Sequence, residues 1–440
     1  MAADSQRPFA SAGKNFIRHF VLKYKILFLF KIMKMYLENL KLDLLNRWKR
    51  AFDELPLLEN HKENIVSEKY IPGYGYNLED YGTPYFLQQG DKIFPQATVR
   101  EIGDYHYYGF TTDGLPCYTS FRHTYNNINW AGYYDYSDSL VEYVEYCINT
   151  GIPSCIKRIQ YRDGEKISYQ SLSIDSRGSV PLREDLSREE AIEYILNAAY
   201  FLSYDVEVFH RTGEEIAKAE GLAMHPGLEE YNYQKLYKYD TGGELTEIRT
   251  VHENGQSQLS YVRIDKTIDI RQLITDLADE MAVAIVDELE AKQVDVPLTL
   301  LELTYRSANK YIPLLSPRSL AFTDEINRKY EDEDVFDLIF LATELDQPYL
   351  EINPARFERS LTQFMQIVRR EGKWDMANAM IRKVAHTLTT TKLLQRIPVG
   401  KEFAAYAVDW ETDVEEFEDI LRECGADPKV ITAWKERGWL

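Results

Sequence analysis

Histidine and cysteine are the side chains that could build a metal site, and both are sparse in this chain. The eight histidines are scattered, at His19, His61, His106, His123, His210, His225, His252 and His386. Zinc sites use imidazole or thiolate pairs about two to four residues apart, and the nearest approach, His106, Cys117 and His123, contains no such pair. We therefore expect no metal site, and we interpret each histidine as an ordinary buried or exposed side chain.

The cysteine pattern also bears on the compartment. Four cysteines occur in 440 residues, at Cys117, Cys147, Cys155 and Cys424, and none forms a C-x-x-C pair. A long chain with few scattered cysteines fits a reducing compartment better than a disulfide framework. The sequence therefore favours a cytoplasmic protein whose cysteines are small core residues.

Catalytic signatures are missing as well. The sequence contains no G-x-S-x-G, H-E-x-x-H, G-x-x-x-x-G-K-[ST] or G-x-G-x-x-G motif. A general acid and base need a cleft that separates their pKa values, whereas acid pairs on helix faces are usually solvated charge. We interpret two pairs in that way: Glu142/Glu145 and Asp276/Glu280. The expectation is a chain with no catalytic centre and no cofactor.

Tyrosine is the unusual residue, with 32 copies, many of them in residues 70–146. Two interpretations stay open. Tyrosine suits a half-buried strand surface, because its ring packs while its hydroxyl stays wet. Tyrosine also suits a binding face, because it gives a large contact area at low entropic cost. If the second holds, the expected contact residues are Tyr105, Tyr107, Tyr133, Tyr134 and Asp135.

The charge distribution is asymmetric. The whole chain has a net charge of −20, residues 1–35 carry +6, and residues 36–440 therefore carry −26. A protein that tracks nucleic-acid phosphates needs a basic stripe, so we expect no nucleic-acid partner. An acidic chain suits a basic protein partner, because opposite charges steer association.

The stretch from Gly103 to Gly151 organises the N-terminal third. A hairpin is predicted around the turn Asp113-Gly114, followed by a helix that starts at Ser137 or Asp138. The helical spacing is carried by Leu140, Val141, Val144, Cys147 and Ile148.

This stretch resembles the second half of the SMI1/KNR4-like (SUKH) domain over about fifty residues. The pattern is G-D-x-x-x-Y/F, then D-G-L-P, then S-x-x-x-x-E-Y/F. It is carried by Gly103, Asp104, Tyr108, Asp113, Gly114, Leu115, Pro116, Ser137 or Ser139, Tyr143 and Cys147. Many members of the SUKH superfamily are bacterial immunity proteins. The resemblance implies a non-catalytic protein that binds a toxin and neutralises it by occlusion, with a basic toxin domain as the partner.

The length predicts a multidomain α+β protein. The expected parts are a basic extension (1–35), a SUKH-like α+β domain (36–155), an α+β middle part (156–265) and a mainly helical C-terminal domain (266–440). Residues 15–36 are too short and too charged to span a bilayer. They are either a basic amphipathic helix on a membrane or partner, or the product of an upstream start with the protein beginning at Met33 or Met35, which we favour.

Other elements follow from periodicity and caps. Strands are expected at 155–161, 167–174, 235–239, 245–252, 258–264 and 403–408, with a type I′ turn at Asn254-Gly255. Residues 296–303 read as a strand or a short apolar helix. Helices are expected at 36–55, from Ser187 with a capping box to Glu190, from Asp269, at 332–344, 354–370, 374–394 and 413–424, and after Asp427-Pro428.

Two further functions stay open beside the immunity-type interpretation. One is an enzyme whose active site, without a sequence motif, lies between the middle and C-terminal parts. The other is a structural adaptor that binds through the acidic helix at residues 270–290.

Overall fold

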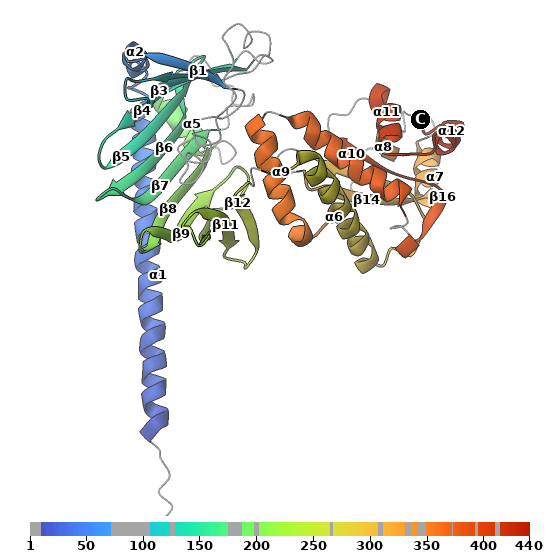
Figure 1. The fold of residues 1–440 in the computed structure, drawn as a ribbon, viewed down its shortest axis with the longest axis horizontal. Helices are drawn as coiled ribbons and strands as arrows, with labels where there is room; N and C mark the ends of the chain where they lie inside the picture. Colours follow the sequence, from blue (N-terminus) through green and yellow to red (C-terminus); the bar gives the residue numbers. More distant parts are fainter. Residues whose placement is uncertain are drawn as a thin grey trace, which may run out of the picture. The chain divides into compact units, whose positions relative to one another are not determined.

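The computed structural model describes residues 10–71, 106–123, 128–174, 187–197, 202–264, 267–306, 311–330, 336–340, 349–371, 373–391, 395–409 and 414–440. The chain divides into two compact units, each with its own core. Unit 1 comprises Met1–Lys238 and Arg249–Ser257, and unit 2 comprises Tyr239–Ile248 and Gln258–Leu440. The protein is a mixed α and β chain, as predicted (Figure 1).

Unit 1 is a long antiparallel sheet with a helix across one face. Helix α1 (Ala10–Ala51) covers residues 36–51 of the helix predicted at residues 36–55, begins further upstream and ends four residues earlier. Leu37, Leu40, Leu44 and Trp48 form its buried stripe, and α1 contacts strands β6 to β9 (Figure 1). Two short helices, α2 (Leu57–Glu63) and α5 (Arg188–Asn197), complete the described helices of this unit.

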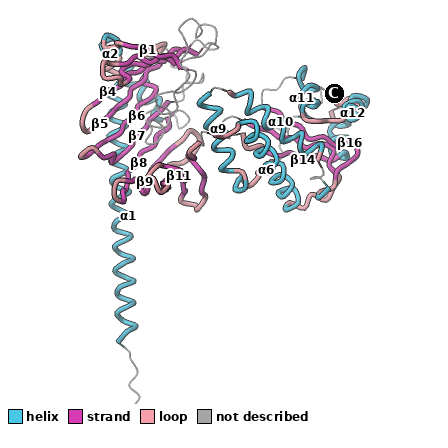
Figure 2. The backbone as a smooth tube through the Cα atoms, viewed as in Figure 1, coloured by secondary structure: helices cyan, strands magenta, loops and turns pink. Residues whose placement is uncertain are grey.

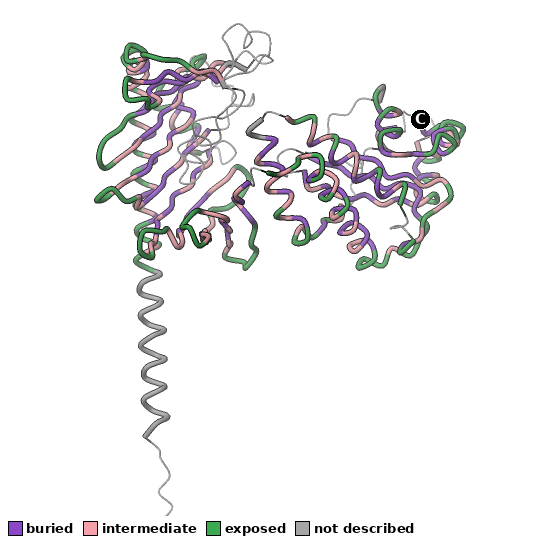
Figure 3. Tube along the Cα trace, viewed as in Figure 1, coloured by how far each residue is buried: buried purple, intermediate pink, exposed green. Residues whose placement is uncertain are grey.

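The strands of this sheet follow the chain order from β1 to β12, and of these the first half of β11 and nearly all of β12 are assigned to unit 2. Their bounds are β1 Ser67–Ile71, β2 His106–Phe110, β3 Pro116–His123, β4 Ile128–Tyr136, β5 Leu140–Cys147, β6 Ile152–Arg162, β7 Glu165–Ile174, β8 Leu202–Thr212, β9 Glu215–Met224, β10 Tyr231–Tyr239, β11 Leu245–His252 and β12 Ser257–Val262. The hairpin β6–β7 and the strands β10 to β12 confirm the prediction, whereas β8 and β9 are additional. Figure 3 shows buried and less buried residues alternating along many of these strands.

The helix predicted from Leu140 to Ile148 is wrong, because Leu140–Cys147 form strand β5 between β4 and β6. Residues 142–144 are all buried, so the period-two alternation of an ordinary strand is lost here. The remaining apolar spacing imitates a helix. Ser137 closes the β4–β5 turn instead of capping a helix: its hydroxyl accepts from the Leu140 amide at 3.1 Å. Of the elements predicted between Gly103 and Gly151, the hairpin is present as β2–β3, and the helix expected after it is absent.

The predicted type I′ turn also lies elsewhere. Such a turn needs positive φ at both central residues, and Asn254 does not have it, whereas Gly255 has φ +82°. Instead, Asp163 and Gly164 have φ +53° and +79° and connect β6 to β7. The β11–β12 connection is longer, spanning residues 253–256: the His252 amide donates to the Gln256 carbonyl at 2.8 Å, and Gly255 takes the left-handed position.

Unit 2 combines its helices with a four-stranded sheet. Its order is β15 (Leu350–Glu351), β14 (Leu314–Ser319), β13 (Leu298–Tyr305) and β16 (Val399–Asp409). The pair β13–β16 is parallel and the others are antiparallel. β13 decides between the two interpretations of residues 296–303 in favour of a strand, and β16 contains the predicted strand 403–408.

Helices surround this sheet (Figure 2). Helices α6 (Ile270–Ala291), α9 (Glu358–Glu371) and α10 (Trp374–Thr390) contact one another, and α10 contacts β13 and β16. The others are α7 (Leu320–Lys329), α8 (Phe336–Phe340), the 3₁₀ helix η3 (Pro354–Arg356), α11 (Val414–Glu423) and α12 (Pro428–Glu436). The caps predicted at Ser187, Asp269 and Asp427 are confirmed. The helix predicted at 354–370 is divided into η3 and α9.

The boundary predicted at residue 155 falls inside strand β6, and the boundary at 265 lies between β12 and α6. Along the described residues, no helix combines the length and apolarity that a membrane crossing requires.

Candidate functional site

The predicted contact residues of the tyrosine-rich stretch separate into buried and accessible ones. Tyr133 and Tyr134 are neighbours on β4, so they point to opposite faces of the sheet, and they are 0% and 4% exposed. Neither ring offers appreciable surface to a partner in this conformation. Asp135 has 53% of its side chain exposed, and Tyr107 on β2 is half-buried. Tyr105 lies outside the described residues.

Tyr133 lies against a buried ionic network between α1 and the sheet. The Glu142 carboxylate on β5 forms salt bridges with the guanidinium groups of Arg47 on α1 and Arg158 on β6, at 2.7 Å and 2.9 Å. Arg47 also contacts Glu54 at 2.6 Å, and the Tyr133 hydroxyl donates to the same Glu54 carboxylate at 3.0 Å. The expectation that Glu142 is solvated charge on a helix is therefore wrong. Its carboxylate holds α1 on the sheet.

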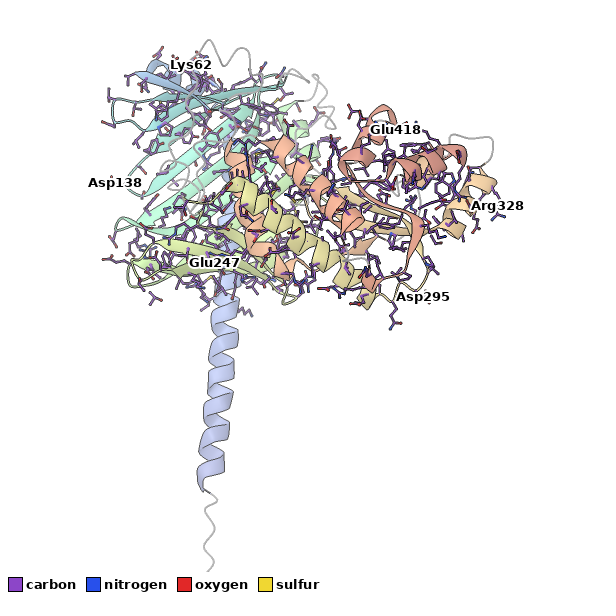
Figure 4. The ribbon with its side chains drawn as sticks, turned by 45° about the vertical axis from the view of Figure 1, so that its right-hand side comes forward. Lys62, Asp138, Glu247, Asp295, Arg328 and Glu418 are labelled. Atoms are coloured by element: carbon purple, nitrogen blue, oxygen red, sulfur yellow. The ribbon has the colours of Figure 1, made fainter. Side chains whose placement is uncertain are left out.

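A hollow of about 360 Å³ lies beside Tyr107, at the β1–β3 end of unit 1. We call this space the tyrosine hollow. It is lined by Lys62, Tyr70, Tyr107, Tyr118 and Ser120. They come from α2 and from strands β1, β2 and β3. Figure 4 labels Lys62 beside these strands.

Sheet register explains why these side chains meet. Tyr70 is the cross-strand partner of Tyr107, and Tyr107 is the partner of Ser120, so the three form one row across β1, β2 and β3. Tyr118 is two residues before Ser120 and therefore shares its face. The alternation in the β2–β3 hairpin could have suggested part of this row, but the contributions of α2 and β1 depend on pairing that the sequence does not show.

The Tyr107 ring makes edge-type contacts with the Tyr70 ring and with the Tyr118 ring. The Tyr70 and Tyr107 ring centroids are 5.3 Å apart with planes at 62°, and those of Tyr107 and Tyr118 are 6.0 Å apart with planes at 67°. The Lys62 ammonium lies 5.5 Å from the Tyr118 centroid. Lys62 also donates to the Glu59 carboxylate at 3.0 Å.

Electrostatics keep Tyr107, Tyr118 and Lys62 in their ordinary protonation states at neutral pH. Burial, with the nearby Glu68 carboxylate, raises the pKa of Tyr107 well above its usual range. Burial also raises the pKa of Tyr118, although Lys62 opposes the shift. The hydrogen bond to Glu59 raises the pKa of Lys62. The hollow thus offers aromatic faces, neutral hydroxyls and a cation, which suit recognition rather than proton transfer.

His61 occupies the next position beside Lys62 on α2. Its ring stacks on Tyr133 with centroids 4.5 Å apart, and its Nε2 lies 3.3 Å from the Asp135 carboxylate. Burial lowers the pKa of His61, and the attraction of Asp135 partly offsets that shift. Asp135 is therefore accessible but already tied to α2.

The predicted absence of metal ligands can be examined only where side chains are described. In those parts of the chain, no group of three or more His, Cys, Asp or Glu side chains could hold a metal ion. His106 stacks on Phe121 with centroids 4.3 Å apart, and the Cys117 thiol donates to the Gly109 carbonyl at 3.4 Å. The His123 side chain lies outside the described set. None of the four cysteines, all of which are described, forms a disulfide.

Two features of unit 2 bear on the alternative functions. Glu302 and Arg318 form a salt bridge of 3.2 Å with each side chain only 1% exposed, so the pair joins β13 to β14 inside the core. The acidic helix α6 is partly neutralised within its own unit. Asp287 lies 2.8 Å from Arg396 and 3.3 Å from Arg356, and Glu290 also pairs with Arg396.

No family model and no curated protein matches the chain.

Proposed function

We propose that this chain is a non-catalytic protein-binding module whose contact site is the tyrosine hollow. The observation that carries the proposal is the meeting of three tyrosine rings, a lysine and a serine hydroxyl around one open space of about 360 Å³. Aromatic side chains with two rotatable bonds lose little entropy on binding, and for that reason they are frequent anchors in protein interfaces.

The proposed partner is a toxin domain, and the proposed action is occlusion of its site. This part rests on the resemblance of the Gly103–Pro116 region to SUKH immunity proteins, whose quoted D-G-L-P residues lie at the β2–β3 turn. The net charge of −20 favours a basic partner. We place the protein in the cytoplasm, where a reducing environment would keep its four thiols free.

Affinity purification of the tagged full chain from its native cells tests this function. The tagged wild-type chain should retain one protein partner in stoichiometric amount, and Tyr107→Leu should lose it. Tyr194→Leu is the matched control, because Tyr194 is an exposed tyrosine on α5. Circular dichroism should show that both variants keep the fold.

Two results would overturn the proposal. Recovery of a small molecule or metal without a protein partner would favour the enzyme. Asp276 and Asp279 are both exposed on α6. The adaptor would be favoured if the partner still binds the Tyr107→Leu variant but no longer binds a variant with Asp276→Lys and Asp279→Lys.

A further inference from the structure

We propose that the tyrosine hollow is an aromatic cage for a cationic side chain, the guanidinium or ammonium of an arginine or lysine on the partner protein. Lys62 is the intramolecular cation that this side chain displaces. This inference rests on the proposed function and specifies the chemistry that the same site recognises.

The orientation of the three tyrosine rings favours a cationic ligand. Aromatic rings attract a cation over their faces, within about 6 Å of the centroid. A cation is held best when several rings turn their faces toward one space. Tyr70, Tyr107 and Tyr118 have adjacent centroids 5.3 and 6.0 Å apart and planes at 62° and 67°, so their ring faces differ in direction around a single hollow.

Lys62 is the second, independent observation. Its ammonium is already 5.5 Å from the Tyr118 centroid, so the chain itself places a cation on this wall of the hollow. The side chain is 45% exposed, and its ion-pair partner Glu59 is 73% exposed. Exposed pairs of this kind contribute little stability, and Lys62 can therefore leave the ring at small cost.

Charge around the hollow favours the same class of ligand. Glu59 pairs with Lys62, and Glu68 on β1 accepts from the Tyr70 hydroxyl at 3.3 Å. The cation of Lys62 is thus matched by one carboxylate, and Glu68 adds a second. Glu68 is thus the carboxylate left over beside the hollow; it attracts an incoming cation and repels an incoming carboxylate.

The test measures binding of small probes to the full chain by saturation-transfer NMR. The cationic probe is Nα-acetyl-arginine methylamide, and its neutral isostere is Nα-acetyl-citrulline methylamide. The arginine probe should bind, and the citrulline probe should bind about threefold to thirtyfold more weakly, as the range of cation–π strengths implies. An acidic probe, Nα-acetyl-glutamate methylamide, should not bind.

Variants assign the binding to the cage. Tyr107→Leu and Tyr70→Leu should each weaken binding of the arginine probe by about threefold to thirtyfold. Tyr194→Leu should leave that binding unchanged. Lys62→Met removes the competing cation while keeping the side-chain length, so it should strengthen binding about threefold or more. Lys429→Met, an exposed lysine on α12, is the matched control. The Lys62 variant changes only an exposed position, so it keeps the test valid if a tyrosine variant unfolds.

Equal binding of the arginine and citrulline probes would overturn the cage, as would binding that Tyr107→Leu and Tyr70→Leu leave unchanged. Binding of the glutamate probe that Lys62→Met abolishes would instead identify Lys62 as an anion-binding residue and overturn the cage too. A protein partner that depends on Tyr107 but is not competed by the arginine probe would contradict the cage alone. Absence of any protein partner would contradict the proposed function alone.

Discussion

Arg47 and Arg158 show how single residues fix the position of α1. Both guanidinium groups contact the Glu142 carboxylate, and Arg158 also reaches Asp43 at 2.6 Å. Arg47, Arg158 and Glu142 are all nearly buried. A buried charge is tolerated when it is paired and hydrogen-bonded, and it becomes strongly destabilising when its partner is removed.

Glu142→Gln should therefore reduce the free energy of unfolding of unit 1 by about 3–5 kcal/mol, because two buried guanidinium groups lose their shared counter-ion. Denaturant unfolding followed by circular dichroism measures the change. Asp138→Asn is the control: Asp138 is exposed in the turn that precedes the same strand (Figure 4). A change no larger for Glu142→Gln than for Asp138→Asn would contradict the role of the network.

His61 gives unit 1 a pH-dependent stability. Burial lowers its pKa below the usual value of about 6.5, so the folded chain takes up the proton less readily than the unfolded chain. The contribution of His61 to the free energy of unfolding should be constant above about pH 6.5. It should fall as the pH drops from there toward the pKa of His61 in the folded chain. His210, whose pKa burial also lowers, contributes in the same direction.

Replacing His61 with phenylalanine should flatten the lower part of this pH profile and keep the stacking on Tyr133. The double variant with His210→Phe should flatten it further. Thermal unfolding at several pH values checks both. A wild-type slope that neither substitution changes would assign the pH dependence to other groups.

Residue types predicted which side chains to inspect but not which of them are accessible. Tyr107 could be selected from the tyrosine pattern, and it does line the hollow. Tyr133 and Tyr134 have the same residue type and similar sequence surroundings, yet both are buried. Tyr133 is covered by His61 and Glu54, and Tyr134 packs with Tyr108, Phe110 and Tyr143 on the other face of the sheet. Both contacts depend on strand pairing and helix packing, which the residue type does not show.

Elements with local signals were predictable, and elements defined by their neighbours were not. The caps Asp269 and Asp427 need only residues within one helical turn, and both side chains accept from the amide two residues later. Strand β5 is flanked by β4 and β6 and buried on both faces in its centre, so its pattern could not be distinguished from a helix.

Glycine and tyrosine cooperate across strands β9 and β10. Gly221 is the cross-strand partner of Tyr233, and a Cβ atom added at Gly221 would lie 2.3 Å from that ring. The Tyr233 hydroxyl donates to the buried Glu207 carboxylate at 2.6 Å, so the ring has little freedom to move. The Tyr233 ring of β10 therefore fills the space that a side chain at position 221 would occupy.

Gly221→Ala should destabilise unit 1 by about 1–3 kcal/mol through this overlap. A double-mutant cycle with Tyr233→Leu isolates the cause, because Gly221→Ala should cost clearly less when the ring is absent. Denaturant unfolding of the four chains provides the comparison. Additive effects would show that the tyrosine ring is not responsible.

At the scale of the whole molecule, the two units do not follow a single cut in the sequence. The chain belongs to unit 1 up to Lys238, to unit 2 at Tyr239–Ile248, to unit 1 again at Arg249–Ser257, and to unit 2 afterwards. Strand β11 is shared between them. Composition and turn signals predicted several parts, but such an interleaved division depends on which strands pair, and pairing is non-local.

The net charge of −20 has a measurable consequence for a basic partner. The association rate constant should fall about tenfold or more when NaCl rises from about 20 to about 200 mM, since salt screens long-range attraction. The dissociation rate should change much less. Stopped-flow or surface-based kinetics would measure both, and an association rate that salt leaves unchanged would rule out electrostatic steering.

The chain-order arrangement of β1 to β10 has a consequence for how the protein is made. Each of these strands pairs with the strand that leaves the ribosome just before it, so most contacts of the sheet are short in sequence. Because α1 precedes these strands in the chain, its apolar stripe is present while the hairpins emerge one after another. The sheet can therefore grow during translation, one hairpin at a time, without waiting for the C-terminal half of the chain.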